Sequence, residues 1–150
     1  MKIEDEILQG KFKNKNHKVL INIFYTFNWL YERQLNILKP FGLTIQQFNI
    51  LRILRGQYPN PATVKLLKER MMDKMSDASR LVEKLRSKGL LERRICDKDR
   101  RNVDVLITED GLNLLKQVDK KDKEFDSLVE NLESNEIDML NNLLDKIRSS

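Results

Sequence analysis

The chain has 150 residues, enough for one compact core with an appended element. With 40% hydrophobic and 34% charged residues, its composition is that of a soluble protein and excludes a disordered one. The sequence has no apolar run as long as a membrane span, no N-terminal secretory signal, and one cysteine, which excludes an internal disulfide, so we expect no membrane association and a place in the reducing cytoplasm.

The charge changes sign along the chain. Residues 1–60 hold nine Lys or Arg against four Asp or Glu, residues 61–107 hold thirteen against eight, and residues 108–150 hold six against eleven. A basic surface in the first two thirds of the chain suits a polyanion. A generic solvated surface would explain the charge alone equally well.

A first long helix is predicted for about residues 18–39, where apolar and aromatic residues are too dense for a one-sided stripe. Such a helix must be buried on more than one side, which in so short a chain indicates a partner subunit. Pro40 and Gly42 end the helix. Four of its aromatic residues could line a ligand pocket or belong to a plain core: Phe24, Tyr25, Trp29 and Tyr31.

Two further helices follow. Thr44, with Gln47 three residues later, has the pattern of a capping box and predicts the start of a second helix. Gly56 and the stretch Tyr58-Pro59-Asn60 are predicted to form the loop that follows it. Asn60 before Pro61 predicts the N-cap of a third helix that extends to about residue 71.

The fourth predicted helix is short and has two different faces. Asp73 is expected to cap it and Gly89 to end it. Its inward face is formed by apolar residues at helical spacing, namely Ala78, Leu81, Val82 and Leu85. Its other face is polar and consists of Ser76, Asp77, Arg80, Glu83, Lys84 and Ser87.

The apolar period changes from helical to alternating after Gly89. Residues 90–95 and 102–107 are predicted strands, and the charged residues 96–101 between them suit a β-hairpin turn. Thr108 caps a fifth helix that is expected to reach about Phe125. A last helix opens at Ser134 and has an apolar face of Ile137, Leu140, Leu143, Leu144 and Ile147.

This order of helices and a basic hairpin is that of a winged helix-turn-helix, here mainly α with a small β-hairpin. One helix would present its polar face to the major groove of DNA, and arginines of the hairpin, the wing, would reach the neighbouring minor groove. The candidate DNA-binding residues are Ser76, Asp77, Ser79, Arg80, Lys84, Lys98, Arg100 and Arg101. The alternative is a solvated amphipathic helix beside an ordinary charged hairpin.

Nothing in the sequence indicates catalysis. It has no nucleophile–base signature and no glycine-rich phosphate loop, and one histidine (His17) with one cysteine (Cys96) does not form a metal cluster. We therefore expect no enzyme, no metal and no cofactor. Cys96 is interpreted as a strand-end residue, because the alternative, a redox switch, needs an exposed thiol with a lowered pKa.

Several segments resemble MarR-type regulators, over roughly residues 43–115. They are LKERM (67–71), SDASRLVEKL (76–85), KGLLER (88–93), DRR (99–101) and LITEDG (106–111). The chain departs from that pattern at Met72, where members usually have glycine, and at Cys96-Asp97, where they usually have aspartate-proline.

The resemblance implies a homodimer whose N- and C-terminal helices intertwine and which binds operator DNA. It often implies repression and release by a small phenolic or other aromatic ligand. It matches Arg80 to an arginine that enters the major groove, Arg101 to one that enters the minor groove, and Asp99 with Arg100 to a pair that holds the wing in shape. Asp97 is a further candidate for structuring the wing.

We therefore expect three parts: a dimerisation helix (1–42), a winged helix-turn-helix DNA-binding domain (43–107) and dimerisation helices (108–150). The expected function is that of a sequence-specific regulator, a repressor, that binds an inverted repeat in double-stranded DNA as a homodimer and responds to a small-molecule effector. The alternative is a winged-helix module for protein–protein interaction without specific DNA readout.

Overall fold

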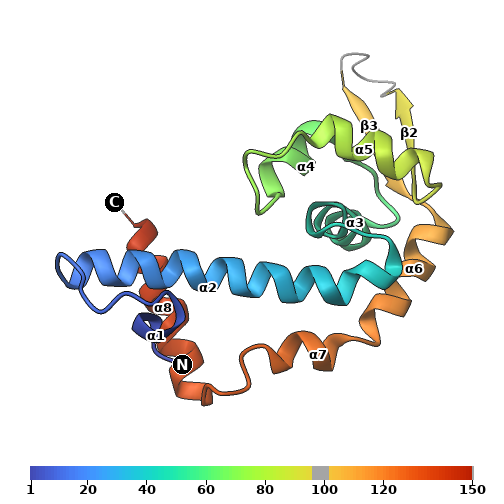
Figure 1. Ribbon diagram of the computed structural model, residues 1–150. Helices are drawn as coiled ribbons and strands as arrows, with labels where there is room; N and C mark the ends of the chain where they lie inside the picture. The colour runs from blue at the N-terminus through green and yellow to red at the C-terminus, as the bar shows by residue number, and fades with distance from the viewer. Residues whose placement is uncertain (96–101, 150) are drawn as a thin grey trace.

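The computed structural model describes residues 1–95 and 102–149. Its longest element is the helix α2, which connects the two ends of the molecule (Figure 1). A lobe of helices and strands lies at one end of α2, and the two chain termini lie at the other. The elements in order are α1 (Ile3–Glu6), α2 (Lys15–Leu38), the 3-10 helix η1 (Lys39–Phe41), α3 (Ile45–Gln57), β1 (Ala62–Thr63), α4 (Val64–Arg70), α5 (Ala78–Ser87), β2 (Leu91–Ile95), β3 (Val103–Ile107), α6 (Glu109–Asp119), α7 (Asp122–Ser127) and α8 (Ser134–Arg148). This architecture confirms the predicted winged-helix order.

Helix α2 begins where Asn14 caps it. The Asn14 side chain accepts a hydrogen bond of 2.8 Å from the backbone N–H of His17, so the helix starts three residues before the predicted position. At its other end, η1 contains Pro40, and Gly42 adopts the left-handed region with φ of 68°. The predicted end of the helix is confirmed, whereas the short helix α1 was not predicted.

The capping box that opens α3 is confirmed. Gln47 N donates to Thr44 Oγ1 over 3.1 Å, and Thr44 N donates to Gln47 Oε1 over 3.2 Å. The predicted loop is confirmed at Tyr58-Pro59-Asn60 but wrong at Gly56, because α3 continues to Gln57. The buried side of this helix carries Ile50, Leu51, Ile53 and Leu54.

The predicted start of the third helix is also wrong. Ala62 and Thr63 form strand β1, which pairs with Val105 and Asp104 of β3. Helix α4 begins only after Thr63, whose hydroxyl accepts a hydrogen bond of 3.1 Å from Leu66 N. Asn60 therefore does not cap this helix, because the sheet takes up the residues that follow it.

The cap of α5 lies four residues later than predicted. Asp73 Oδ1 accepts a hydrogen bond of 3.0 Å from Met75 N and so stabilises the turn before the helix. Asp77 is the N-cap, accepting a hydrogen bond of 3.1 Å from Arg80 N. The end of the helix at Gly89, with φ of 74°, is confirmed.

The hairpin strands are confirmed to within one residue. The sheet is antiparallel with strand order β1-β3-β2, and its register pairs Leu91 with Ile107 and Ile95 with Val103. The turn predicted for residues 96–101 lies outside the described residues.

The C-terminal part has one more break than predicted. Thr108 caps α6 as expected, accepting a hydrogen bond of 3.1 Å from Gly111 N. However, α6 ends at Asp119, and a separate helix, α7, carries Phe125. The break allows both Asp119 and Phe125 to contact α3, through an ion pair with Arg55 and a ring stack on Phe48.

The core lies almost entirely in the lobe. Within residues 1–95 and 102–149, every buried hydrophobic residue except Ile3 falls between Leu38 and Val118. The apolar face predicted for α8 exists but is exposed, with Ile137, Leu140, Leu143 and Ile147 between 36% and 60% accessible.

Candidate nucleic-acid interface

Helix α5 separates its side chains into the two predicted faces. Ala78, Val82 and Leu85 are buried, and Leu81 packs against the core from a half-buried position. Ser79, Arg80 and Lys84 are exposed. The hydrophobic core thus fixes the rotation of α5 and directs its polar face outward.

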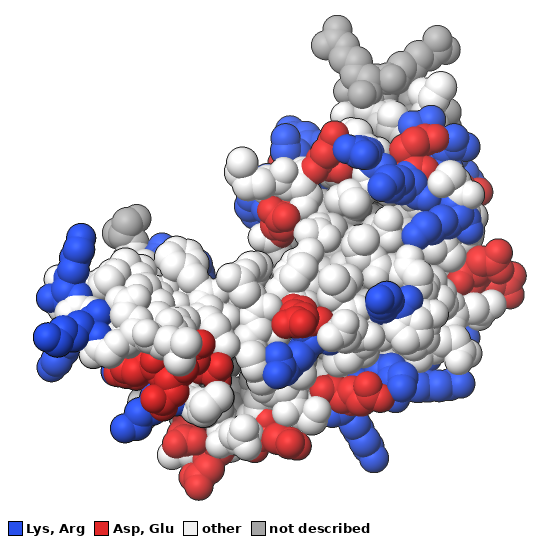
Figure 2. Space-filling view, viewed as in Figure 1, with Lys and Arg blue, Asp and Glu red and all other residues white. Residues whose placement is uncertain are grey.

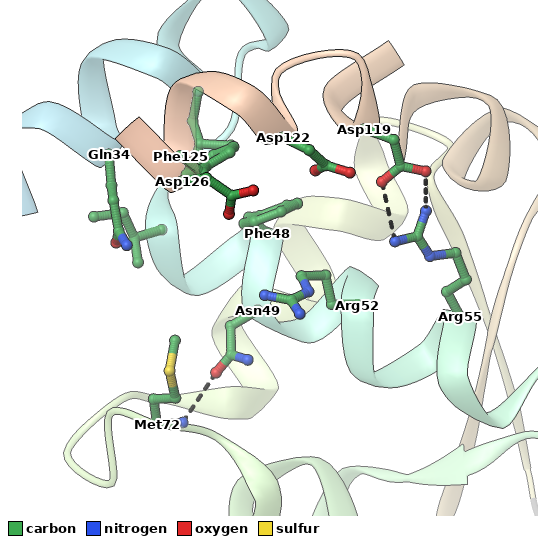
Figure 3. A pocket seen from close by; sticks show the side chains of 12 residues that line it. Gln34, Phe48, Asn49, Arg52, Arg55, Met72, Asp119, Asp122, Phe125 and Asp126 are labelled. Atoms are coloured by element: carbon green, nitrogen blue, oxygen red, sulfur yellow. Dashed lines mark hydrogen bonds and ion pairs between the residues drawn. The ribbon is translucent and has the colours of Figure 1, made fainter. Parts of the chain in front are cut away.

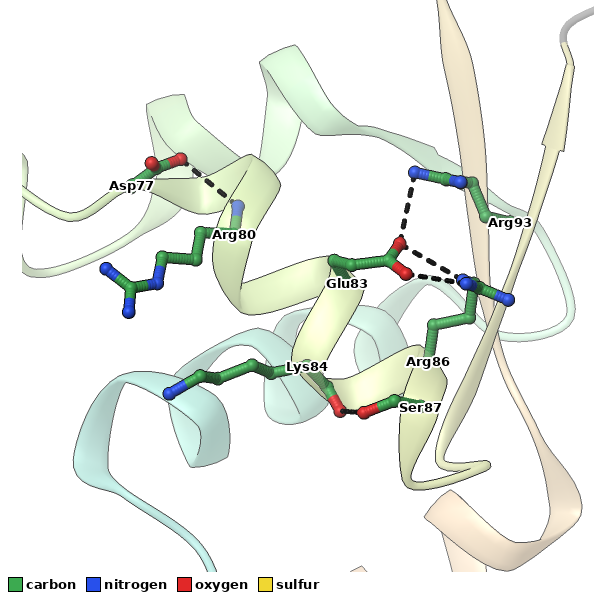
Figure 4. Close-up of polar contacts among 7 residues, drawn as sticks. All are labelled: Asp77, Arg80, Glu83, Lys84, Arg86, Ser87 and Arg93. Atoms are coloured by element: carbon green, nitrogen blue, oxygen red, sulfur yellow. Dashed lines mark hydrogen bonds and ion pairs between the residues drawn. The ribbon is translucent and has the colours of Figure 1, made fainter.

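Arg80 and Lys84 are the two cations that this face offers. They point in the same direction, away from the acidic residue of the helix, Glu83 (Figure 4). Neither forms an ion pair with any residue in 1–95 or 102–149. Their charges are therefore available to an external anion.

Two of the polar candidates have structural contacts of their own. The carboxylate of Asp77 holds the first turn of α5. Ser76 is half-buried and hydrogen-bonds to Asp73. The backbone N–H of Met75 and then the hydroxyl of Ser76 lower the pKa of Asp73 below its ordinary value, so this turn is built around an ionised carboxylate.

Glu83 forms a cluster with two arginines between α5 and β2 (Figure 4). Arg86 donates from Nε to Glu83 Oε2 over 3.1 Å and from Nη2 to Oε1 over 2.5 Å. Arg93 of β2 places Nη1 3.2 Å from Glu83 Oε2. The hydrogen bonds from Arg86 lower the pKa of Glu83, and the same bonds raise the pKa of Arg86, so this cluster stays charged.

Strand β2 carries one more ion pair. Arg94 Nη2 lies 2.5 Å from Glu92 Oε1. Of the four arginines on α5 and β2, only Arg80 has no carboxylate partner among the described residues. The sequence alone did not distinguish Arg80 from the other three on this ground.

The remaining candidates lie outside the described residues. These are Lys98, Arg100 and Arg101 for DNA binding, Asp97 and Asp99 for wing structure, and Cys96. The strands that lead into and out of this segment are described, and β2 packs against α5. Their assigned roles stay predictions.

Helix α4 and the turn after it add basic residues that the sequence analysis did not single out. Lys65, Lys68 and Lys74, with Glu69, line a shallow groove beside α4. Figure 2 shows Lys and Arg side chains gathered over the lobe, with acidic side chains between them. The lysines were visible as charges in the sequence, but only the fold places them around one groove.

A cavity of about 390 Å³ lies between α3 and α7 (Figure 3). Arg55 closes one end by donating to both carboxylate oxygens of Asp119, over 2.8 and 3.2 Å. The rings of Phe48 and Phe125 stack in the same region, with centroids 6.0 Å apart. The cavity thus has a fixed charged end and an aromatic wall.

A second cavity, of about 540 Å³, adjoins the first. The two share lining residues from α2, α3 and the turn before α5: Gln34, Ile45, Asn49 and Met72. Asn49 Oδ1 accepts a hydrogen bond of 2.9 Å from Met72 N, so α3 is tied directly to the turn before α5. Both partners of this bond line both cavities.

The predicted aromatic set does not form one pocket. Tyr31 lines the second cavity, together with Phe27 and Leu30. Tyr25 and Trp29 instead line a separate hollow beside α1, and Phe24 is 64% exposed and lines neither.

Two kinds of feature are absent from the described residues. No helix there is long and apolar enough to cross a membrane. No group of three or more His, Cys, Asp or Glu side chains there could hold a metal ion.

The chain is similar in sequence and in fold to known proteins. Residues 43–103 match the sequence model of the MarR family, and no curated protein matches the chain. A mutant of MarR from E. coli, in complex with operator DNA, is 24% identical, with a TM-score of 0.80 over 92% of this chain and 99% of that one. BpsR from Bordetella bronchiseptica, studied for regulation of its DNA binding by 6-hydroxynicotinic acid, is 20% identical, with a TM-score of 0.80 over 94% and 99%.

A third similar structure is the organohalide-sensing regulator RdhR in its 2,4-dichlorophenol-bound form. It is 18% identical, with a TM-score of 0.81 over 95% of this chain and 86% of that one. The match to a family of transcription regulators agrees with the expectation that the chain is not an enzyme. Residues 43–103 are therefore similar to the MarR family, and the chain shares the fold of a MarR structure over 92% of its length.

Proposed function

We propose that this protein is a transcription repressor that binds double-stranded DNA as a homodimer, recognises an inverted repeat, and is released by a small aromatic ligand. The observation that carries this proposal is Arg80 on the exposed face of α5, which has no ion-pair partner within residues 1–95 and 102–149, with Lys84 one turn away. The operator complex of the E. coli relative supports DNA as the partner.

In this proposal α5 enters the major groove and Arg80 contacts a base. A guanidinium can donate two hydrogen bonds to O6 and N7 of guanine, which no other base pair offers in the same geometry. Lys84, a point charge without a planar fork, would contact phosphate. Arg101 would enter the minor groove, where a narrow A·T-rich groove attracts arginine.

The proposed dimer follows from the exposed apolar residues of α2 and α8. Val19, Leu20, Phe24 and Phe27 of α2 are between 48% and 64% accessible, although the helix lies beside the core. Together with the apolar face of α8, they form a surface that a second copy would cover. We accordingly propose residues 1–42 and 108–150 for dimerisation and residues 43–107 for DNA binding.

The ligand would enter the second cavity, between α2 and α3. Its apolar lining of Phe27, Leu30, Tyr31, Ile45 and Met72 suits an aromatic ring, and its volume lies in the range of small-molecule sites. Because Asn49 and Met72 border the cavity, a ligand there could shift the turn that leads into α5.

The test starts with selection of bound fragments from random duplex DNA. The parent and two variants are then titrated on the selected operator at near-physiological salt. Arg80→Ala should weaken binding and lose about 1–3 kcal/mol of discrimination at one symmetric pair of positions. Lys123→Ala, which removes one exposed positive charge from α7, should bind like the parent.

Three results would count against the proposal. One is an Arg80→Ala variant that binds the operator as tightly as the parent. The second is a chain that stays a monomer, rather than about twice 17.8 kDa, in light scattering at micromolar concentration. The third is a protein complex that persists in high salt without DNA binding, which would favour the interaction-module alternative, because phosphate contacts weaken steeply with salt.

A further inference from the structure

Glu83 forms ion pairs at the surface with two arginines that belong to different elements. Arg86 belongs to α5 and Arg93 to β2, and both place nitrogen atoms within 3.2 Å of the Glu83 carboxylate. We call Glu83, Arg86 and Arg93 the seam. All three side chains are 46% accessible, so the seam is a surface feature and not part of the core.

We propose that Glu83 masks the charge of Arg86 and Arg93 and thereby limits sequence-independent binding of DNA. This inference rests on the proposed DNA binding but goes beyond it. It assigns to an acidic residue of the binding face the role of keeping the sequence-independent part of the affinity low, so that binding to unrelated DNA stays weak.

The position of the seam supports this role. If α5 lies in the major groove and the wing in the adjacent minor groove, the seam between α5 and β2 faces the phosphate strand that separates the two grooves. Arginines facing that strand would contact phosphates, which carry no sequence information and contribute the same free energy on every duplex.

The charge balance of the seam supports it as well. With Glu83 ionised, the three side chains carry a net charge of +1, and without the carboxylate they carry +2. A glutamate is ordinarily ionised at neutral pH, and the hydrogen bonds from Arg86 lower the pKa of Glu83 further, so its negative charge is present under those conditions. Arg80, which would contact a base, has no such partner in the described residues.

A simple tether between α5 and the wing is the competing explanation, because the same bonds join both elements. The two roles predict opposite results. Loss of a tether should weaken binding to the operator, since the helix and the wing are no longer held in register. Loss of a mask should strengthen binding to unrelated DNA, since two guanidinium groups become available to phosphate.

The experiment compares the parent with Glu83→Gln, which keeps the shape and one acceptor oxygen but removes the charge. Both are titrated over a salt series on the selected operator and on an unrelated duplex of equal length. Glu83→Gln should bind the unrelated duplex about tenfold more tightly at 0.1 M salt. Its plot of log K against log [salt] should be steeper by about 1–2 for the dimer. Binding to the operator should tighten by a similar factor, because contacts with phosphate do not depend on the sequence of the duplex.

Two further variants identify the source of the gain. Glu92→Gln removes a carboxylate from β2 that pairs, among the described residues, with Arg94 and no other cation, and we expect it to have a smaller effect than Glu83→Gln. The double variant Glu83→Gln, Arg86→Gln should lose most of the gain, because one released guanidinium is gone. Melting curves of each variant verify that it is folded.

The results separate the two proposals. If the parent binds its operator but Glu83→Gln binds the unrelated duplex with unchanged affinity and salt slope, the masking role is wrong and the proposed function stands. Weaker binding of Glu83→Gln to both duplexes, with an unchanged salt slope, would show that Glu83 tethers α5 to the wing and does not mask the arginines. A parent that binds no duplex at all overturns the proposed function and this inference together.

Discussion

The lobe and the chain ends differ in how many of their apolar residues are buried. The lobe, from Leu38 to Val118, buries seventeen hydrophobic residues in one cluster. The described residues outside this span bury one, Ile3, although α2 and α8 are rich in apolar side chains. The lobe therefore has a core of its own, whereas the ends have apolar surface that needs a partner.

This difference in burial implies that the lobe and the chain ends are stabilised in different ways. Packing within one chain should set the free energy of unfolding of the lobe, independently of protein concentration. The ends should be stabilised by association and thus depend on concentration. The predictions below test this division, in order of decreasing effect.

The largest effect is expected for Leu85→Ala in the lobe. Leu85 is fully buried on the inner face of α5, and its truncation leaves a cavity in the core. We expect the free energy of unfolding to fall by about 2–5 kcal/mol, measured by urea denaturation followed by circular dichroism. A loss that shrinks as protein concentration rises would mean that the lobe is not independent of the ends.

A smaller effect, of a different kind, is expected for Leu143→Glu in α8. Leu143 is 52% accessible in the single chain, so a charge there should not disturb the lobe. In the dimer it would be buried, and loss of a buried leucine costs about 1.5–3 kcal/mol. The dimer dissociation constant, measured by analytical ultracentrifugation, should rise by at least about tenfold.

Asn142→Glu is the matched control, since Asn142 is an exposed residue on the opposite, polar side of α8. It should dimerise like the parent. Equal weakening by both variants would indicate a general effect of charge and not the loss of an apolar interface.

An effect of about 1 kcal/mol is expected for Thr108→Ala, where the lobe joins the C-terminal helices. The Thr108 hydroxyl accepts a hydrogen bond from Gly111 N and donates one of 2.7 Å to the carbonyl of Gly89. Its loss should lower the melting temperature at every protein concentration. Thr108→Ser, which keeps both bonds, should restore most of the stability, and a serine variant as unstable as alanine would contradict the capping role.

The smallest effect is expected for Cys96→Ser. Cys96 is the only cysteine, so it has no resolving partner within its own chain. The serine variant should match the parent in stability and in operator binding, with and without peroxide. A parent that loses operator affinity on oxidation, while the serine variant keeps it, would establish a redox role.

The sequence predicted the elements that have a local signal. The Thr44–Gln47 capping box, the two faces of α5 and the stop at Gly89 each depend on residues within one or two turns, and all three are present. Two other local signals, the caps predicted at Asn60 and Asp73, were wrong, and strand β1 was missed because it has no local signal. Strand β1 has two residues and no period of its own, and it exists only because β3 lies beside it.

Gly111 illustrates a requirement that only the fold reveals. It lies in the first turn of α6, where no unusual backbone angle demands glycine. A Cβ atom there would lie 2.3 Å from the carbonyl oxygen of Leu90 and 2.7 Å from Ile107 Cγ1. The close approach of α6 to the hairpin excludes a side chain, and no local pattern in the sequence expresses that contact.

The sequence by itself determined the order of the helices and hairpin and the presence of arginines on α5 and the wing strand, because periodicity, caps and residue identity are local properties. Only the tertiary structure decided which of those arginines keep a free charge. Glu83 and Arg93 are ten residues apart and belong to different elements, yet their side chains meet at 3.2 Å, whereas Arg80 faces away from both. An ion pair depends on distance in space, and the packing of β2 against α5 sets that distance.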